Sequence, residues 1–480
     1  MGIRSCILPA LVAVFSWSTG WAQEGSDFDA WLKKDQQSLQ EFKDKRDRQF
    51  LEFLQRDWQE YQAFQGLVRD QVPKPLTLPV VEPQAPAPPL ESKIVEIPSP
   101  PVISPSLPAP PPAPLQHPVY FVFYGDSLAV SCDQDMILPL DQPLGKGSIR
   151  AFWEGMSRSA YEECLAQAQQ LGQRLGLNDW GYGQLLGRIG QSLYPGDGDR
   201  VRLFVWFMLA KSGYAAQVGY DAQRIYLLVP TLQTLYGNTY LTLGDQKYYS
   251  LSFEDQPEPI ETVYTYEGNY PEADRRIDLS LTAPPRLGGG IEEKVLEFRY
   301  GSQDLQVKVS LERLALGFLR SYPQTEYAVY FASAPSTSAR SSLIQGLKPL
   351  ISGRSEVEAV DILLRLVQLG FGYQVDQEQF GRERSLFADE TLFYPASDCE
   401  DRAILFAYLV RELLGLEVIG LDYPGHIAAA VRFSSPVPGD AVVVGGQSYT
   451  ICDPTYLNAT AGMAMPNFKG VEPKIIQIRG

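Results

Sequence analysis

Large apolar side chains recur every 11 residues between positions 26 and 68, and mostly charged or polar residues separate them. An 11-residue period equals 3.67 residues per turn, close to the natural α-helix. No Gly or Pro interrupts the segment before Gly66. The pattern predicts one long amphipathic helix of coiled-coil type within residues 23–72. Its apolar stripe consists of two series, which are Phe28, Leu39, Phe50 and Tyr61, and Trp31, Phe42, Phe53 and Phe64.

Such a narrow stripe forms no core of its own and therefore needs a partner. Our first interpretation is a homo-oligomer that associates through residues 26–68. Packing of the helix on the globular part of the same chain, or docking on a membrane surface, are the alternatives that the pattern leaves open.

The segment before this stripe, residues 1–22, has the features of a signal peptide. Arg4 precedes an apolar run, Ile7 to Trp17, that is too short to span a bilayer, and Gly20 and Ala22 have cleavage-site spacing. No later stretch approaches the roughly 20 apolar residues that a transmembrane helix requires. We therefore expect an exported protein, periplasmic or secreted, with no transmembrane segment after signal removal.

Residues 73–118 contain 17 prolines in 46 positions. A segment of this composition buries too little apolar surface to fold and favours polyproline II. We predict a disordered, Pro-rich linker that holds the globular part away from the N-terminal helix.

From residue 119 onward the composition is globular, and its length of about 360 residues suggests two units. Short matches recur in the same order in both parts, first at an offset of 179 residues and later at 202. One example is Asp199-Arg200 followed by Phe204, which matches Asp401-Arg402 followed by Phe406. We interpret this as an internal duplication, with units at 119–260 and 296–480 and a connecting segment at 261–295.

The formal charge of −16 argues against nucleic acid as a partner. The chain has only two histidines, and His117 lies in the Pro-rich segment, so no Cys/His metal site and no cofactor are expected. Export implies an oxidising compartment, in which Cys132 and Cys164 either form a disulfide or remain reduced.

Cys399, His426 and Asp453 have the order and local contexts of a nucleophilic triad. Cys399 precedes an apolar helical run that ends at Gly415, so its thiol lies in the first turn, where the helix dipole favours thiolate. His426 follows a Tyr-Pro-Gly turn and opens an apolar strand, and Asp453 ends the next strand. A helix-start thiol, a base and an orienting carboxylate are the groups that acyl transfer requires.

The run Asp-Cys-Glu-Asp-Arg before a buried helix, then a Gly-His strand and an Asp-Pro strand end, resembles the transglutaminase-like superfamily. The resemblance covers roughly residues 338–466 and implies a papain-related fold with Cys399 as nucleophile, His426 as base and Asp453 as orienting carboxylate. The whole arrangement is also similar to an uncharacterised family of exported bacterial proteins with a duplicated transglutaminase-like domain. The expected fold is α+β, with two tandem units of helices packed on antiparallel sheet. The backbone N–H of Cys399, with Tyr394 as a candidate second group, would stabilise an oxyanion.

The first unit lacks the triad. At the offset of 202, Asp197 and Arg224 stand where the second unit has Cys399 and His426. We therefore expect a degenerate first unit and a thiol-dependent peptidase, amidase or transamidase in the second. Its substrate would be a peptide or protein, with cell-wall peptides as candidates. The alternative is a noncatalytic, oligomeric scaffold or binding protein with the same fold.

Overall fold

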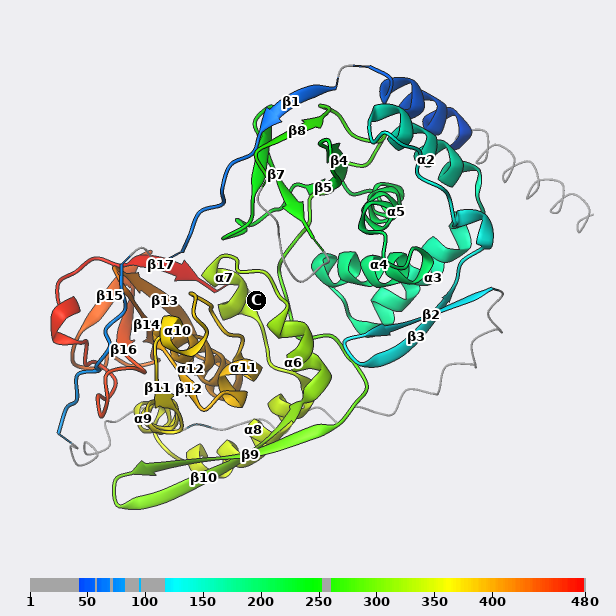
Figure 1. Ribbon diagram of the computed structural model, residues 1–480. Coiled ribbons are helices and arrows are strands. Elements are labelled where there is room, and N and C mark those ends of the chain that lie inside the picture. The colour runs from blue at the N-terminus through cyan, green and yellow to red at the C-terminus, as the bar shows by residue number, and fades with distance from the viewer. Residues whose placement is uncertain are drawn as a thin grey trace, which may run out of the picture. The chain divides into compact units, whose positions relative to one another are not determined.

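The computed structural model describes residues 43–56, 58–69, 72–82, 95, 117–252 and 260–478 (Figure 1). The chain divides into two compact units, residues 1–56 and residues 57–480. In the first unit, residues 43–53 are helical. The leader predicted for residues 1–22 lies outside the described residues. Within the described part of the chain, no helix is long and apolar enough to cross a membrane.

The structure corrects the long helix predicted within residues 23–72. Helix is present at 43–53, but β1 (Gln59–Gln62) is a strand that pairs antiparallel with β8 (Thr262–Thr265). Aromatic residues near β1 pack on the globular part, and the ring of Trp58 lies 4.9 Å from that of Tyr266. Strand pairing and these aromatic contacts override the helical periodicity here. Self-association through residues 26–68 stays a prediction.

The structure also corrects the start of the predicted disordered linker. Residues 72–82, which we call the strap, lie against the globular part (Figure 1). Tyr373 donates its hydroxyl to the carbonyl oxygen of Pro75 at 2.8 Å, and the amide of Val81 donates to Leu457 at 2.9 Å. These hydrogen bonds to other segments supply the partners that the proline-rich segment does not find within itself. Residues 83–94 and 96–116 lie outside the described residues.

The first half of the globular part, residues 118–265, begins with a hairpin and continues through four helices into a sheet. The helix α5 packs on β4 and β5, and its apolar residues are buried. The elements are β2 (Pro118–Phe123), β3 (Asp126–Ser131), α2 (Lys146–Arg158), α3 (Tyr161–Leu175), α4 (Asp179–Leu193), α5 (Gly198–Lys211), β4 (Gln217–Tyr220), β5 (Ile225–Val229), β6 (Tyr240–Leu243), β7 (Gln246–Leu251) and β8.

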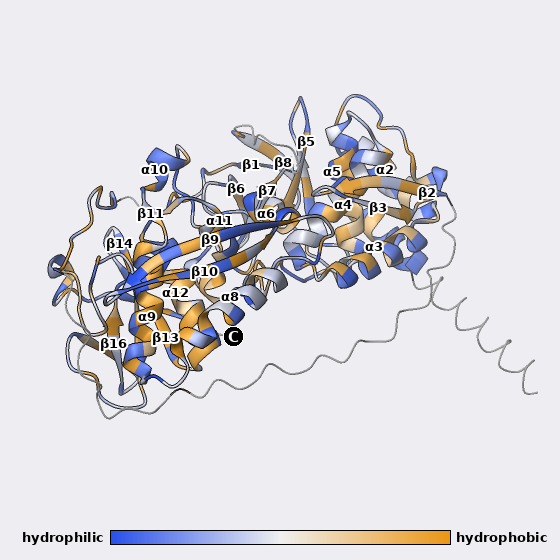
Figure 2. Cartoon of the chain, turned by 90° about the horizontal axis from the view of Figure 1, so that it is seen from below, coloured by the Kyte–Doolittle hydropathy of each residue, from blue (hydrophilic) through white to orange (hydrophobic). Residues whose placement is uncertain are grey.

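The second half, residues 291–477, follows the same plan. A longer hairpin leads into helices, and α12 packs on β13 and β14 and against α9. In Figure 2 the ribbons of α9 and α12 are coloured as apolar, which agrees with their buried side chains. The elements are β9 (Ile291–Tyr300), β10 (Gln303–Glu312), α6 (Arg313–Arg320), α7 (Tyr327–Ala332), α8 (Thr337–Ile351), α9 (Glu356–Leu369), β11 (Gly372–Tyr373), α10 (Asp376–Gln379), α11 (Ala388–Phe393), β12 (Ala396–Ser397), α12 (Cys399–Leu414), β13 (Glu417–Tyr423), β14 (His426–Arg432), β15 (Ala441–Val444), β16 (Gln447–Cys452) and β17 (Lys474–Gln477).

The two sheets have the same strand order. The first is β6-β7-β5-β4-β8, extended at its β8 edge by β1, and the second is β15-β16-β14-β13-β17. In both, each strand pairs antiparallel with its neighbours. The fold is therefore α+β, as predicted. The predicted connecting segment 261–295 contains β8, which belongs to the first sheet, and the start of β9.

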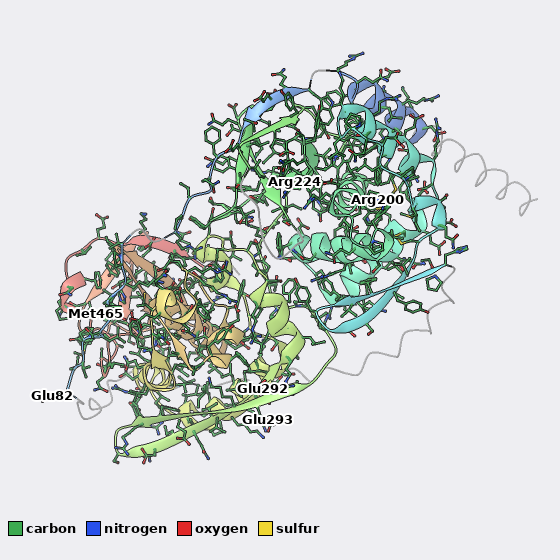
Figure 3. All side chains as sticks on the ribbon, viewed as in Figure 1. Glu82, Arg200, Arg224, Glu292, Glu293 and Met465 are labelled. Atoms are coloured by element: carbon green, nitrogen blue, oxygen red, sulfur yellow. A yellow bond between two sulfur atoms is a disulfide. The ribbon has the colours of Figure 1, made fainter. Side chains whose placement is uncertain are left out.

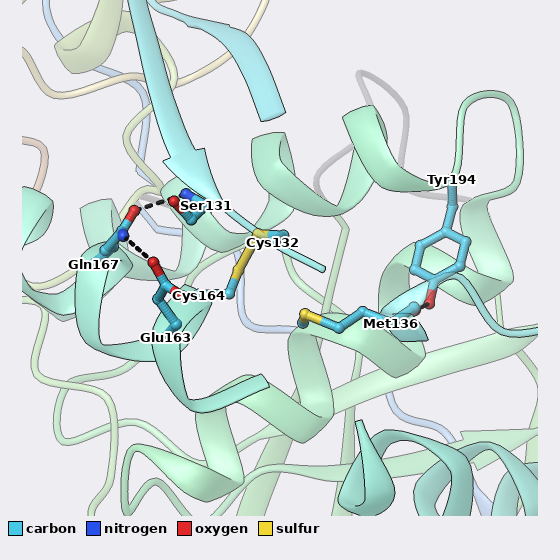
Figure 4. The surroundings of a disulfide bond; sticks show 7 residues. All are labelled: Ser131, Cys132, Met136, Glu163, Cys164, Gln167 and Tyr194. Atoms are coloured by element: carbon cyan, nitrogen blue, oxygen red, sulfur yellow. Dashed lines mark hydrogen bonds between the residues drawn. A yellow bond between two sulfur atoms is a disulfide. The ribbon is translucent and has the colours of Figure 1, made fainter. Parts of the chain in front are cut away.

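A disulfide joins Cys132, directly after β3, to Cys164 on α3 (Figure 4). It ties the first hairpin to the helical layer of the first half. Beside it, the side chain of Gln167 accepts a hydrogen bond from the backbone N–H of Ser131 at 2.6 Å. Of the alternatives that the sequence left open for these two cysteines, the structure has the disulfide.

Candidate active site

Cys399 is the first residue of α12 and is fully buried. Asp398 precedes the helix as its N-cap, and Gly415, with φ of 64°, ends it in the left-handed region that favours glycine. Both ends of the helix lie where the sequence predicted them. The thiol of Cys399 therefore occupies the first turn, beside the helix-start N–H groups that have no carbonyl partner within the helix.

His426 and Asp453 lie side by side at the ends of neighbouring strands. His426 opens β14, pairing with Tyr423 across a two-residue turn, and Asp453 directly follows β16. The Nε2 atom of His426 lies 2.8 Å from Oδ2 of Asp453, and both side chains are buried. The imidazole stacks on the ring of Phe468 at 4.7 Å, which fixes its plane.

Asp453 is held as a carboxylate. Burial alone would raise its pKa, but His426 and Thr455 hold the pKa below its usual range. Thr455 donates both its hydroxyl, at 2.7 Å, and its backbone N–H, at 3.0 Å, to Oδ1. The backbone N–H of Tyr456 also donates to Oδ1, at 3.3 Å, so this oxygen is held in place while Oδ2 faces the imidazole.

The thiol lies beside the strand that carries the histidine. The backbone N–H of Ile427, the residue after His426, lowers the pKa of the Cys399 thiol. The Nδ1 atom of His426 is buried and has no hydrogen-bond partner among the described residues. Because Nε2 faces Asp453, Nδ1 is the ring atom left to exchange a proton with a thiol.

Five acidic residues surround the start of α12, namely Asp376, Glu383, Asp398, Glu400 and Asp401. The ammonium group of Lys74, from the strap, lies among four of them. Its Nζ atom is 2.8 Å from Asp398, 2.9 Å from Glu383 and 3.5 Å from Asp376, and it also contacts Glu400. The side chain of Lys74 is only 3% exposed, so this is a buried ionic cluster.

This cluster controls the charge on the thiol. Burial, together with the carboxylates of Glu400 and Asp398, raises the pKa of Cys399 well above its usual value. Lys74 and the Ile427 N–H act in the opposite sense. The thiol donates to Oε2 of Glu400 at 3.3 Å. In this arrangement Cys399 is a protonated thiol, whereas the sequence favoured a thiolate at the helix start.

The same carboxylates shift one another. Burial and the charge of Glu400 raise the pKa of Asp376 to about 7, and burial and Glu400 also raise that of Asp398. Burial opposes ionisation of Glu400 as well, but Lys74 holds the pKa of Glu400 below its ordinary value. Two groupings here have the donors of a cation site, Asp376 with Glu383 and Glu400, and Asp376 with Asp398 and Asp401. The ammonium of Lys74 contacts carboxylates of both groupings.

Tyr394, the candidate for a second oxyanion donor, follows α11. Its ring packs against Phe380 and Phe393, with centroids 5.2 Å away in each case, and its carbonyl oxygen accepts from Lys294. These are packing contacts, and the oxyanion role of Tyr394 stays a prediction.

Sequence reasoning missed Lys74 and its contacts with the acidic residues at the start of α12. The sequence feature that indicates the need for a cation is the acidic run Asp398, Glu400 and Asp401 at the start of an otherwise apolar helix. Buried carboxylates need a cation, and the sequence places none beside them except Arg402. Arg402 donates to Ser397 and to the backbone carbonyls of Gln368, Phe371 and Gly372.

The first half carries different residues at the corresponding places. Asp197 is the N-cap of α5. Its carboxylate accepts two hydrogen bonds from Arg200, one from the backbone N–H at 2.9 Å and one from Nε at 2.8 Å. Ile225 opens β5, where His426 opens β14, and Arg224 precedes it. Arg200 and Arg224 are labelled in Figure 3. With the first residues of α5 and α12 aligned, Gly198 takes the place of Cys399.

Comparisons of the chain with protein-family models, with curated proteins and with solved structures find no match. The family and the activity therefore rest on the residues themselves.

Proposed function

We propose that this protein is an exported, thiol-dependent acyl-transfer enzyme of the transglutaminase-like type, acting on peptide or protein amides. The observation that carries the proposal is the pairing of His426 with Asp453 at 2.8 Å, while Nδ1 of His426 has no partner among the described residues and the next residue, Ile427, lowers the pKa of the Cys399 thiol. A buried histidine with one nitrogen on a carboxylate and the other free is suited to general base catalysis.

In the proposed reaction, Nδ1 of His426 takes the proton of the Cys399 thiol as the sulfur attacks an amide carbonyl. The tetrahedral intermediate collapses to a thioester, and the imidazolium returns the proton to the leaving amine. Water or a second amine then attacks the thioester, which releases the acyl product and restores the thiol. Asp453 stabilises the imidazolium and holds its orientation, while the helix-start N–H groups face the developing oxyanion.

A tandem duplication is supported by the shared strand order of the two sheets and by a packed helix before each. Under this proposal the first half is a unit without the triad, and it serves as scaffold or recognition surface. The disulfide between Cys132 and Cys164 supports export, because disulfides persist mainly in oxidising compartments.

The alternative is a noncatalytic scaffold. One observation favours it, namely the complete burial of Cys399 beside carboxylates that keep its thiol protonated. A buried, protonated thiol is stable among these side chains without taking part in any reaction.

The pH profile of iodoacetamide labelling at Cys399 separates the two. The rate is measured in the folded protein by peptide mass spectrometry, which distinguishes Cys399 from Cys452, the other free thiol among the described residues. A base at His426 predicts a labelling rate at pH 7 that falls at least ~10-fold in His426→Ala.

The matched control is His117→Ala, because the His117 side chain is 58% exposed and is the only other histidine. It should retain the wild-type profile. Cys399 is buried, so the protein must open locally before iodoacetamide reaches the thiol. This opening scales the labelling rates of wild type, His426→Ala and His117→Ala by the same factor. An ordinary thiol titration that is the same in wild type and His426→Ala would overturn the proposed enzyme in favour of the scaffold.

A further inference from the structure

The strap passes directly over the candidate active site. A Cβ atom placed on Gly425, the residue before His426, would lie 3.0 Å from the carbonyl oxygen of Pro73 and 3.0 Å from the side chain of Val72. Gly425 has φ of 73°, so glycine is required there both by the turn and by the close approach of the strap. Further along, Tyr373 and Asn458 bind the carbonyl oxygens of Pro75 and Val81.

Lys74 extends from the strap into the acidic pocket formed by Asp376, Glu383, Asp398 and Glu400. Except for Glu383, whose side chain is 30% exposed, these carboxylates are almost completely buried. Oδ1 of Asp376 and Oδ1 of Asp398 are buried and have no hydrogen-bond partner among the described residues. The pocket thus offers more acceptors than Lys74 uses, directly beside the residue proposed as nucleophile.

A buried carboxylate group of this size is costly unless a cation enters it. Lys74 comes from a segment more than 300 residues away in sequence, held otherwise by a few backbone contacts. A ligand that brings its own ammonium group and extended backbone would satisfy the same carboxylates. The strap therefore has the properties of an occupant that a second chain can replace.

The pocket recognises an ammonium group and does not deliver an amine for reaction. An ammonium surrounded by carboxylates keeps its proton, as the pKa of Lys74 shows, because Glu400 and Asp398 outweigh burial and raise it. A protonated amine has no lone pair with which to attack a thioester. The positive charge instead lowers the pKa of the adjacent Cys399 thiol.

We propose that the acidic pocket beside Cys399 is a subsite for a lysine side chain of a peptide substrate, and that the strap fills it with Lys74 until such a peptide displaces the strap. The proposal rests on the proposed function for its substrate class. It adds a specificity determinant, the carboxylates around Lys74, and an intramolecular block on the site.

The first experiment measures whether the pocket binds a free alkylammonium ion. Lys74→Ala removes the atoms from Cγ to Nζ, which n-propylammonium replaces and neutral 1-propanol mimics without charge. Both are added to Lys74→Ala in a Cys399→Ser background, so that no acyl chemistry contributes. We expect n-propylammonium to raise the melting temperature by at least about 2 °C and 1-propanol to leave it unchanged.

Leu76→Ala is the matched control, because the Leu76 side chain lies on the strap and is 69% exposed. It should show no shift with either additive. Equal shifts with the amine and the alcohol, or no shift with either, would overturn the subsite.

A second measurement uses the wild-type protein and so does not depend on how Lys74→Ala folds. Acetylation by an activated ester is followed at Lys74 and at Lys308, whose side chain is 60% exposed. We expect Lys74 to react at least ~100-fold more slowly. Acetylation of Lys74 at the rate of Lys308 would show that the strap does not occupy the pocket, and the proposal would fail.

The outcomes distinguish this proposal from the proposed function. If the triad is inactive, the labelling profile of Cys399 is that of an ordinary thiol, yet the ammonium still binds in the Cys399→Ser background. If the pocket is not a subsite, ammonium binding is absent while the dependence of Cys399 labelling on His426 remains.

Discussion

The two halves of the globular part share one strand order, but they differ in the burial of the charged side chains at the start of the packed helix and in where the partners of those side chains come from. In the first half, Asp197 and Arg200 form a pair within one helical turn, with side chains 34% and 28% exposed. In the second half, Asp398 and Glu400 are buried and depend on Lys74 from the strap. The same framework therefore supports either a self-sufficient surface pair or a buried cluster that needs a distant cation.

This difference separates what the fold requires from what the candidate site requires. The first half forms its helix and sheet without a cysteine, a histidine or a buried acidic cluster at these positions. The unusual burial of charge in the second half is therefore not needed to build the sheet or the helix. Buried charge kept at such cost is typical of functional sites.

The largest expected effect comes from removing the cation in each half. Lys74→Ala leaves buried carboxylates without their partner and should lower the free energy of unfolding by about 3–5 kcal/mol. Arg200→Ala removes half of a partly exposed pair and should cost about 1 kcal/mol or less. Urea denaturation of both variants makes the comparison. Equal losses would mean that the two clusters do not differ in the way that their burial indicates.

A change of intermediate size concerns the pH dependence of stability. Asp389, which is fully buried and accepts two hydrogen bonds from Ser336, has its pKa raised to about 6, chiefly by burial. The folded protein therefore holds a proton between pH 4 and 6 that the unfolded chain has lost. The stability that this proton contributes is fully present at low pH and is lost as the pH rises through 6.

Asp389→Asn should remove this dependence. Between pH 4 and 6.5 the wild type should lose roughly 3 kcal/mol more stability than the variant. Asp221, in the first half, is the control, because hydrogen bonds from Tyr226, Gln223 and Arg224 overcome burial and lower its pKa. Its contribution is lost only below about pH 4, so Asp221→Asn should run parallel to the wild type over this range. Parallel curves for Asp389→Asn would contradict the prediction.

The smallest expected effect compares two tyrosines that bind the N-terminal segments. Tyr373→Phe removes the hydrogen bond to Pro75 of the strap, at a cost of about 1 kcal/mol, and should speed iodoacetamide labelling of Cys399 about fivefold. Tyr264→Phe removes the contact of Tyr264 with Glu60 of β1. It should leave labelling unchanged, because that contact lies on the sheet of the first half. Equal acceleration in both would indicate a general loosening of the chain.

The sequence by itself determined the elements whose signals are local. The apolar run that ends at Gly415 predicted α12, and the Tyr-Pro-Gly turn placed His426 at the start of a strand. The matches at fixed offsets predicted two units built on one plan, and the strand orders agree with that plan. These features depend on periodicity, capping and turn chemistry, which act over a few residues.

Only the tertiary structure decided the rest. Residues 59–62 continue a helical pattern but form β1, because the free edge of β8 supplies hydrogen-bond partners about 200 residues away. Lys74 reads as part of a proline-rich linker, yet it lies among carboxylates that follow more than 300 residues later. The charge state of Cys399 likewise follows from that cluster and from its burial. Sheet edges and buried charges pair with groups that are close in space but distant in sequence. The local sequence pattern does not show which distant segment supplies these groups.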